Sequence, residues 1–300
     1  MYSITEGADL TPTPRPQPCC VQLRVLPPCP PKKRLFVVRH GESVWNQGQR
    51  EANLVALYSQ VDHPLNAKGR QQAEGLAASL AAASSSRLEL VSDEACALRE
   101  LCAAPLVLCS PLTRALQTCL IGLGAACGLR EAARRVRLVP AARERRNHGA
   151  VDSIGCAVGE AEIAERLLTT TTQLYGGDAE AAKAAVGGVA LDDLEVCSKW
   201  WSGPPAEPKE EVAERLGDLV RQLRYCHEET IVLVSHSHWI RELLREYLAD
   251  AFSVAQPELG AMLRSHKLST CGVACLDLDF ATADRPIVDV KLLLGTELVK

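Results

Sequence analysis

The sequence predicts an α/β protein, because two patterns alternate along the chain. Stretches with apolar residues at helical spacing are expected to form helices over 66–83, over 209–225 and after His238, each with one apolar face. Short apolar runs typical of buried strands lie at 35–38, 105–109, 136–139, 230–235, 272–278 and 287–294. Strands that alternate with one-faced helices favour a sheet covered by helices.

The composition favours one large core in a soluble protein. The chain has 300 residues, of which 47% are hydrophobic, and a formal net charge of −4. This length suffices to bury such a core. The acidic charge and the lack of an extended basic tract argue against nucleic acid as a partner. No apolar run reaches the roughly 18 residues that a membrane-spanning helix needs, so no membrane partner is expected. The sequence does not indicate the oligomeric state.

The 13 cysteines are expected to be reduced thiols. Their number is odd, no pair has the CxxC spacing, and the N-terminus lacks a basic and then apolar signal segment. Most of them lie inside apolar runs, where a free cysteine packs as a small hydrophobic residue. We therefore expect a cytoplasmic protein, although the N-terminal segment could carry a targeting signal.

The chain divides into an N-terminal arm and one domain. Residues 1–33 are rich in proline, which lacks a backbone donor, so we expect a disordered arm. The domain covers 34–300. Its alternating pattern weakens over about 155–208, which we interpret as an insertion over the sheet. That insertion and the segment 43–60 are expected to determine specificity, with a solvated surface excursion as the alternative for the insertion.

Polar residues follow three of the expected strands directly. The run at 35–38 is followed by Arg39-His40-Gly41, the run at 105–109 by Ser110 and then Arg114, and the run at 230–235 contains Ser235 and leads to His236 and His238. Ligands of open α/β sheets bind at the carboxyl ends of the strands. We therefore expect these arginines and histidines to converge at one edge of the sheet.

Converging cations without carboxylate ligands suit a phosphoryl group better than a metal ion. Guanidinium groups match phosphoryl oxygens with two hydrogen bonds and stabilise charge in the transition state. Ser110 as the N-cap of a helix that carries Arg114 would aim backbone N–H groups at the same anion. His236 and His238 lack a third and a fourth ligand nearby, so neither a metal nor another cofactor is expected.

A neutral histidine at such a pocket can attack phosphorus, and His40 fits this role. The neighbouring Arg39 disfavours the imidazolium form and can hold phosphoryl oxygens. The leaving oxygen then needs a proton, which a carboxylic acid can donate. The stretch after the strand at 136–139 contains two candidates, Glu144 first and Asp152 second.

Four separated segments, RHGESVWN, SPLTRALQT, ARERRNHG and VLVSHSHWIRELL, resemble the histidine phosphatase superfamily and its phosphoglycerate-mutase-like fold. The resemblance covers roughly residues 34–250, and the four segments occur in the family's order. It implies a three-layer α/β/α sandwich with a mostly parallel sheet. It also implies a metal-independent phosphomonoester hydrolase of the histidine phosphatase type, which acts through phosphorylated His40. The implied site residues are His40 as nucleophile, Glu144 as proton donor, and Arg39, Arg114, His236, Ser43, Asn46 and Ser237 around the phosphoryl group.

Three features depart from the family pattern. Where family members often carry a glycine and then an acid-glycine pair after the glutamate, this chain has Gly149-Ala150-Val151-Asp152-Ser153-Ile154-Gly155. Ser237 stands where a glycine usually follows the second histidine, and His238 adds a further ring. Two alternatives to a phosphatase remain: a phosphoglycerate-mutase-type phosphotransferase with the same residues, and a non-catalytic phosphate-binding or scaffold protein on the same fold. A small phosphorylated molecule is the expected partner, and a phosphoprotein is not excluded.

Overall fold

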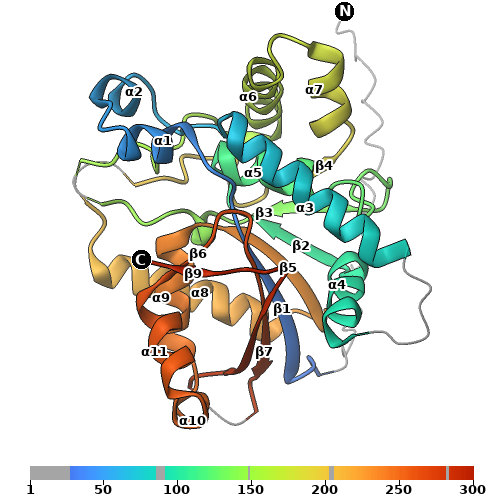
Figure 1. The fold of residues 1–300 in the computed structure, drawn as a ribbon, viewed down its shortest axis with the longest axis vertical. Coiled ribbons are helices and arrows are strands. Elements are labelled where there is room, and N and C mark those ends of the chain that lie inside the picture. The colour runs from blue at the N-terminus through green and yellow to red at the C-terminus, as the bar shows by residue number, and fades with distance from the viewer. Residues whose placement is uncertain (1–27, 86–91, 148, 203–205, 282–283) are drawn as a thin grey trace, which may run out of the picture.

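A mostly parallel sheet forms the centre of the molecule (Figure 1). The computed structural model describes residues 28–85, 92–147, 149–202, 206–281 and 284–300. Within these ranges, seven strands are ordered β4-β3-β2-β5-β1-β7-β8. They are β1 (Lys32–Arg39), β2 (Leu106–Cys109), β3 (Arg135–Leu138), β4 (Ala190–Asp192), β5 (Thr230–Ser235), β7 (Val273–Asp279) and β8 (Ile287–Leu293).

The central strand β1 separates a parallel part of the sheet from an antiparallel part. β1 pairs in parallel with β5. The pairs β5–β2, β2–β3 and β3–β4 are parallel as well. On its other side β1 pairs antiparallel with β7, and β7 with β8. In the β1–β5 register Arg39 lies opposite Ser235, so both strands end at the same edge. Two short strands, β6 (Lys267–Leu268) and β9 (Leu298–Val299), pair separately.

Helices cover both faces of the sheet and make the predicted three-layer α/β/α sandwich (Figure 1). One face packs against α3 (Ala67–Ser85), α4 (Asp93–Ala103), α5 (Thr113–Leu123), α6 (Gly159–Leu174) and α7 (Ala179–Val186). The other packs against α8 (Lys209–Tyr225), α9 (Ser237–Tyr247), α10 (Asp250–Ala255) and α11 (Pro257–Ser265). The alternation of burial within β1 explains this arrangement, because Phe36 and Val38 belong to the first core and Leu35 and Val37 to the second.

Two short helices lie beside the carboxyl end of β1. They are α1 (Val44–Arg50) and α2 (Leu54–Tyr58), and a 3₁₀ turn, Pro140–Ala142, follows β3. Ser43 caps α1, since its hydroxyl accepts a hydrogen bond from the Asn46 backbone N–H at 3.2 Å. Trp45, Leu57 and Ala150 form a small apolar cluster of their own. This cluster lies outside the two large cores.

All six expected strands and all three expected helices are present, with ends that shift by up to a few residues. The segment 155–208 contains α6, α7 and β4, and β4 is an edge strand of the main sheet beside β3. That this segment is an insertion stays a prediction. Of the expected N-terminal arm, residues 1–27 lie outside the described residues, and β1 begins at Lys32.

The described cysteines are free thiols, and several of them, such as Cys109 and Cys119, lie in the core as expected for small hydrophobic residues. None of the helices in the described part of the chain is both long and apolar enough to cross a membrane.

Candidate active site

The two histidines that the sequence places after strands meet at the edge of the sheet. His40 follows β1 and His236 follows β5, and the parallel pairing of these strands brings their rings to 4.9 Å between centroids. His40 is 2% exposed and His236 is fully buried. The predicted convergence of the strand ends is therefore present in the structure.

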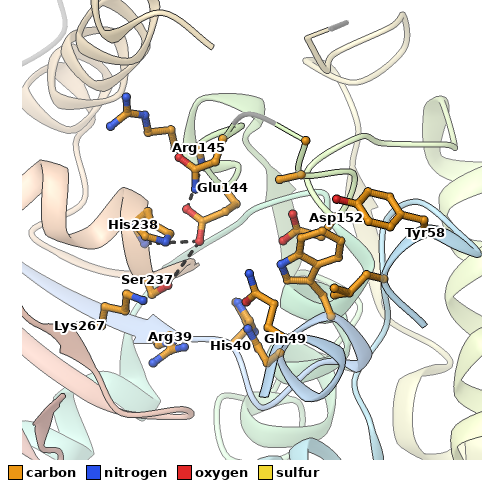
Figure 2. A pocket seen from close by; sticks show the side chains of 16 residues that line it. Arg39, His40, Gln49, Tyr58, Glu144, Arg145, Asp152, Ser237, His238 and Lys267 are labelled. Atoms are coloured by element: carbon orange, nitrogen blue, oxygen red, sulfur yellow. Dashed lines mark hydrogen bonds between the residues drawn. The ribbon is translucent and has the colours of Figure 1, made fainter. Parts of the chain in front are cut away.

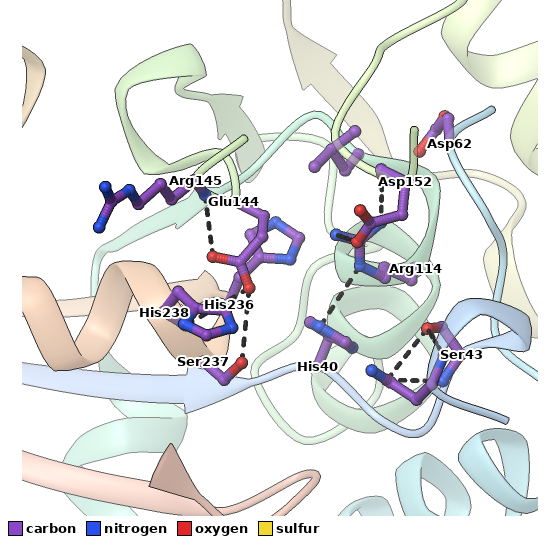
Figure 3. Close-up of polar contacts among 12 residues, drawn as sticks. His40, Ser43, Asp62, Arg114, Glu144, Arg145, Asp152, His236, Ser237 and His238 are labelled. Atoms are coloured by element: carbon purple, nitrogen blue, oxygen red, sulfur yellow. Dashed lines mark hydrogen bonds and ion pairs between the residues drawn. The ribbon is translucent and has the colours of Figure 1, made fainter. Parts of the chain in front are cut away.

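Hydrogen bonds define which nitrogen of His40 carries the proton. The Nδ1 atom lies 2.7 Å from the Gly41 carbonyl oxygen, which can only accept, so Nδ1 carries the proton and Nε2 has a free electron pair. Nε2 faces the Nε of Arg114 at 3.3 Å (Figure 3). Burial, followed by the charges of Arg114 and Arg39, lowers the pKa of His40 well below its usual value. The ring is thus neutral near pH 7.

The glycine after His40 allows its loop to approach the first turn of α3 closely. A Cβ atom on Gly41 would lie 2.7 Å from the carbonyl oxygen of Gly69 at the start of α3. The Gly41 backbone N–H donates to the Thr118 hydroxyl at 3.0 Å. This contact explains the residue type in the RHG segment, because any side chain here would push the loop that carries His40 away from α3.

Arg114 enters the site from the first turn of α5. This helix begins at Thr113 and has Leu112 at its N-cap, so the prediction that Ser110 caps it is wrong. Two residues separate the serine from the first helical residue, which places its hydroxyl too early for capping. The Ser110 hydroxyl lies instead 2.7 Å from Nε2 of His236. It therefore orients the second histidine of the site.

Asp152 holds the guanidinium group of Arg114. Two nitrogens of this group donate to Asp152, one to its carbonyl oxygen at 2.6 Å and one to Oδ2 at 3.0 Å. Burial raises the pKa of Asp152 to about 6; the charge of Arg114 acts in the opposite direction and that of Glu144 in the same direction. The second acid candidate from the sequence thus pairs with an arginine that faces His40.

Glu144 lies at the N-terminus of α9, across the site from Asp152 (Figures 2 and 3). Its Oε1 accepts from the backbone N–H groups of Arg145 at 2.9 Å and of Trp239 at 3.2 Å. Its Oε2 accepts from the Ser237 hydroxyl and the His238 backbone N–H, both at 3.4 Å. The free N–H groups at the N-terminus of α9 thus hold the Glu144 side chain in place.

The remaining predicted residues fall into two groups. Arg39 donates to the Leu268 carbonyl oxygen, and its buried Nε has no partner among the described residues. Asn46 lines the pocket in front of His40, whereas Ser43 does not line it and serves as the cap of α1. The structure thus brings Arg39 and Asn46 to the pocket directly and Ser43 only indirectly, through its hydrogen bonds with Asn46 at 3.0–3.2 Å.

The site opens into a cavity of about 260 Å³ (Figure 2). Its lining residues are Arg39, His40, Trp45, Asn46, Gln49, Leu57, Tyr58, Glu144, Arg145, Asn147, Gly149, Ala150, Asp152, Ser237, His238 and Lys267. Several of them come from 43–60, where specificity was expected, and none of the described lining residues comes from 155–208. Lys267 had no signal in the sequence, because it belongs to neither a strand end of the main sheet nor a helix.

The arrangement suits an anion with several oxygens. Arg39 and His40 line one end of the cavity, and Arg114 and His236 lie directly beside His40 without lining it. The described residues contain no group of three or more His, Cys, Asp or Glu side chains that could hold a metal ion. Fold and site together define an α/β protein with a buried cationic pocket around a neutral histidine.

Comparison with known proteins identifies the family. The model of the histidine phosphatase superfamily, branch 1, matches residues 35–147 and 180–270, which is more than half of the chain. The chain therefore belongs to the histidine phosphatase superfamily, and the resemblance found in the sequence is confirmed. No match to a curated protein was found.

Solved structures with a similar fold include phosphatases and a mutase. The α-ribazole phosphatase from Shigella flexneri is 21% identical, with a TM-score of 0.38, and the match covers 85% of this chain and 96% of that one. The mycobacterial glucosyl-3-phosphoglycerate phosphatase is 18% identical, with a TM-score of 0.42, and the match covers 87% of this chain and 98% of that one. The phosphoglycerate mutase from Bacillus anthracis is 14% identical, with a TM-score of 0.45, and the match covers 86% of this chain and 92% of that one. At these identities and TM-scores the matches carry no argument about activity.

Proposed function

We propose that the protein is a metal-independent phosphomonoester hydrolase that acts through phosphorylated His40. The observation that carries this proposal is the state of His40: a buried, neutral ring whose Nδ1 donates to the Gly41 carbonyl oxygen and whose Nε2 has a free electron pair beside Arg114. A neutral imidazole next to guanidinium groups is what an attack on phosphorus requires.

In the first step Nε2 of His40 forms a bond to phosphorus while the bond from phosphorus to the ester oxygen breaks. Arg39 and Arg114 stabilise the charge on the phosphoryl oxygens, and the N–H group of Arg114 that now faces Nε2 at 3.3 Å passes to one of these oxygens. The Gly41 carbonyl oxygen stabilises the positive charge that develops on the ring through its hydrogen bond with Nδ1. The protonated carboxyl group of Glu144 donates its proton to the leaving oxygen.

In the second step a water molecule replaces the alcohol. The Glu144 carboxylate takes a proton from this water, the water oxygen bonds to phosphorus, and the bond from phosphorus to His40 breaks to release inorganic phosphate. Four protein donors, three in the first turn of α9 and one the backbone N–H of Arg145, hold the Glu144 carboxyl group at the cavity, which supports its position as the group that exchanges protons with the leaving oxygen and the water. The volume of the cavity supports a small phosphorylated molecule as the substrate.

The first experiment compares wild type, His40→Ala and His227→Ala in hydrolysis of p-nitrophenyl phosphate and of sugar and glycerate phosphates, with and without chelator. His227 is exposed on the surface and provides the matched control. We expect chelator-resistant turnover that disappears only in His40→Ala. Quenching during turnover with alkaline denaturant should trap a phosphorylated protein in the wild type whose phosphoryl group is stable in alkali and lost in acid. Absence of turnover on all substrates, or turnover that needs a metal ion, would overturn the proposal.

The same experiment separates hydrolysis from the mutase alternative. A mutase forms the same phosphorylated His40 but passes the phosphoryl group to a second hydroxyl instead of to water. Release of inorganic phosphate at the rate of substrate loss supports the hydrolase, and isomerised phosphoglycerate without phosphate release supports the mutase. A cytoplasmic location, which the cysteine content predicts, is part of the proposal and can be tested by fractionation of cells.

A further inference from the structure

One edge of the cavity carries positive charge that the phosphoryl pocket does not use. Lys267, the first residue of β6, lines the cavity next to Arg39 and His238 (Figure 2). No hydrogen bond or ion pair joins its ammonium group to any described residue, although the side chain is partly buried. Burial, and then the charges of Arg39 and Arg241, lower the pKa of Lys267. The lysine therefore lies in a positive field that an anion would relieve.

A second cation lies behind this edge. Arg241 on α9 forms no ion pair with any described carboxylate; its contact is to Nδ1 of His238, at 2.8 Å. The nearest acid in the cavity, Glu144, already accepts from backbone N–H groups at the start of α9. Neither Lys267 nor Arg241 thus forms an ion pair with a carboxylate in the described part of the chain, and the charge of Glu144 offsets only part of the repulsion on Lys267.

The contact with Arg241 determines the proton of His238. A guanidinium group can only donate, so Nδ1 of His238 accepts, and the proton of the neutral ring lies on Nε2. Burial is the first cause that lowers the pKa of His238, which keeps the ring neutral near pH 7. Since His238 lines the cavity, its Nε2–H group is a donor available to a bound molecule.

The wall formed by α1 and α2 has a different character. Trp45 and Leu57 belong to the small apolar cluster, and the rings of Trp45 and Tyr58 meet edge to face at 6.3 Å between centroids. The lining residues of this wall include no charged side chain. Among the other described lining residues, Arg145 already forms an ion pair with Glu242 at 3.4 Å, whereas Lys267 forms none, so a second negatively charged group is best stabilised on the side of His238 and Lys267.

We propose that the substrate is a phosphomonoester with a second anionic group, a carboxylate or a second phosphate, which lies against Lys267 and His238. This proposal rests on the proposed function, because it assumes that the first phosphoryl group occupies the pocket around His40. The two donors of the second site come from β6 and α9, outside the strand ends that surround the first. An ammonium group and a neutral N–H group suit either kind of anion.

The test uses pairs of phosphomonoesters that differ in the second anion. 3-Phosphoglycerate and glycerol 3-phosphate differ by a carboxylate, and fructose 1,6-bisphosphate and fructose 6-phosphate by a phosphate. KM and kcat are measured for the wild type, Lys267→Met, Lys267→Arg and Lys183→Ala, the last being an exposed lysine on α7 as control. The Kd for each compound is also measured by calorimetry in the His40→Ala variant, with and without Lys267→Met, so that binding is read without turnover.

We expect Lys267→Met to raise KM and Kd by about tenfold for at least one compound with two anions and to leave kcat and the single-anion partner within about twofold. Lys267→Arg should restore most of the loss, and Lys183→Ala should have no effect. The pair that responds identifies the second anion as carboxylate or phosphate. Equal effects on both members of each pair, or no effect, would overturn the second site even if hydrolysis is present. Selective loss of binding without hydrolysis in the wild type would retain the site and refute the proposed function.

Discussion

Asparagine in place of Asp152 is expected to change how the stability of the protein depends on pH. Asp152 is 7% exposed, and two nitrogens of Arg114 donate to its carbonyl oxygen and its Oδ2. An asparagine has nearly the same shape and keeps an oxygen that can accept from Arg114. The substitution therefore removes mainly the ionisation of the side chain, with little change in packing.

The magnitude follows from the pKa. Burial raises the pKa of Asp152 from 3.8 to about 6, so the folded protein binds a proton that the unfolded chain has already lost between these values. This preferential proton binding by Asp152 stabilises the folded protein fully below pH 3.8, and the stabilisation is lost as the pH rises through about 6. At 1.36 kcal/mol per pKa unit the full loss is about 3 kcal/mol, of which about 2 kcal/mol falls between pH 4.5 and pH 8. Asp152→Asn lacks this loss.

Urea unfolding followed by circular dichroism at pH 4.5 and pH 8 measures the effect. The free energy of unfolding of Asp152→Asn minus that of the wild type should rise by about 2 kcal/mol from the lower to the higher pH. Only this difference between two pH values is needed, so any constant cost of the substitution cancels. A difference that is independent of pH, or that falls as the pH rises, would refute the reasoning about Asp152.

Three further predictions concern the site and the core. Glu144→Gln should lower kcat by about 100-fold for an alkyl phosphate, whose leaving oxygen needs a proton. With p-nitrophenyl phosphate, whose leaving group needs no proton, the rate of the first step, measured as the burst of p-nitrophenol, should fall much less. Equal losses of the first-step rate for both substrates would contradict the proton-donor role. Ser110→Ala removes the partner of His236 Nε2 at 2.7 Å and should reduce the free energy of unfolding by about 1–3 kcal/mol in urea titrations, with no loss arguing against this contact. Phe36→Ala, fully buried in β1, should cost about 3–5 kcal/mol, and a cost under about 1 kcal/mol would mean that β1 is not central to the core.

The strands of the sheet could largely be found from local pattern. β1, β2, β5 and β7 are continuous apolar runs because helices cover both faces of the sheet. β4 was missed, since it has three residues at the edge of the sheet and only Leu191 among them is buried. A short edge strand leaves too little apolar sequence for such a pattern.

The site could be predicted where it depends on strand ends and not where it depends on contacts between distant segments. His40 and His236 follow parallel neighbours, so the rule for parallel sheets brings them together. Ser110 was assigned to the wrong partner, because the start of α5 shifted by two residues and freed its hydroxyl for His236. Lys267 was not found, since its place at the cavity depends on how β6 packs beside Arg39, whose guanidinium donates to the Leu268 carbonyl oxygen.

The sequence by itself determined the α/β class, the family and the residues at the strand ends, because periodic burial and directly following polar residues are local properties of the chain. Only the tertiary structure decided which polar groups face one another: that Asp152 holds Arg114 across 38 positions of sequence, and that Arg241 orients His238 toward the cavity. The physical reason is that hydrogen-bond geometry and the loss of solvent, which set the ionisation of these groups, exist only once distant segments are packed together.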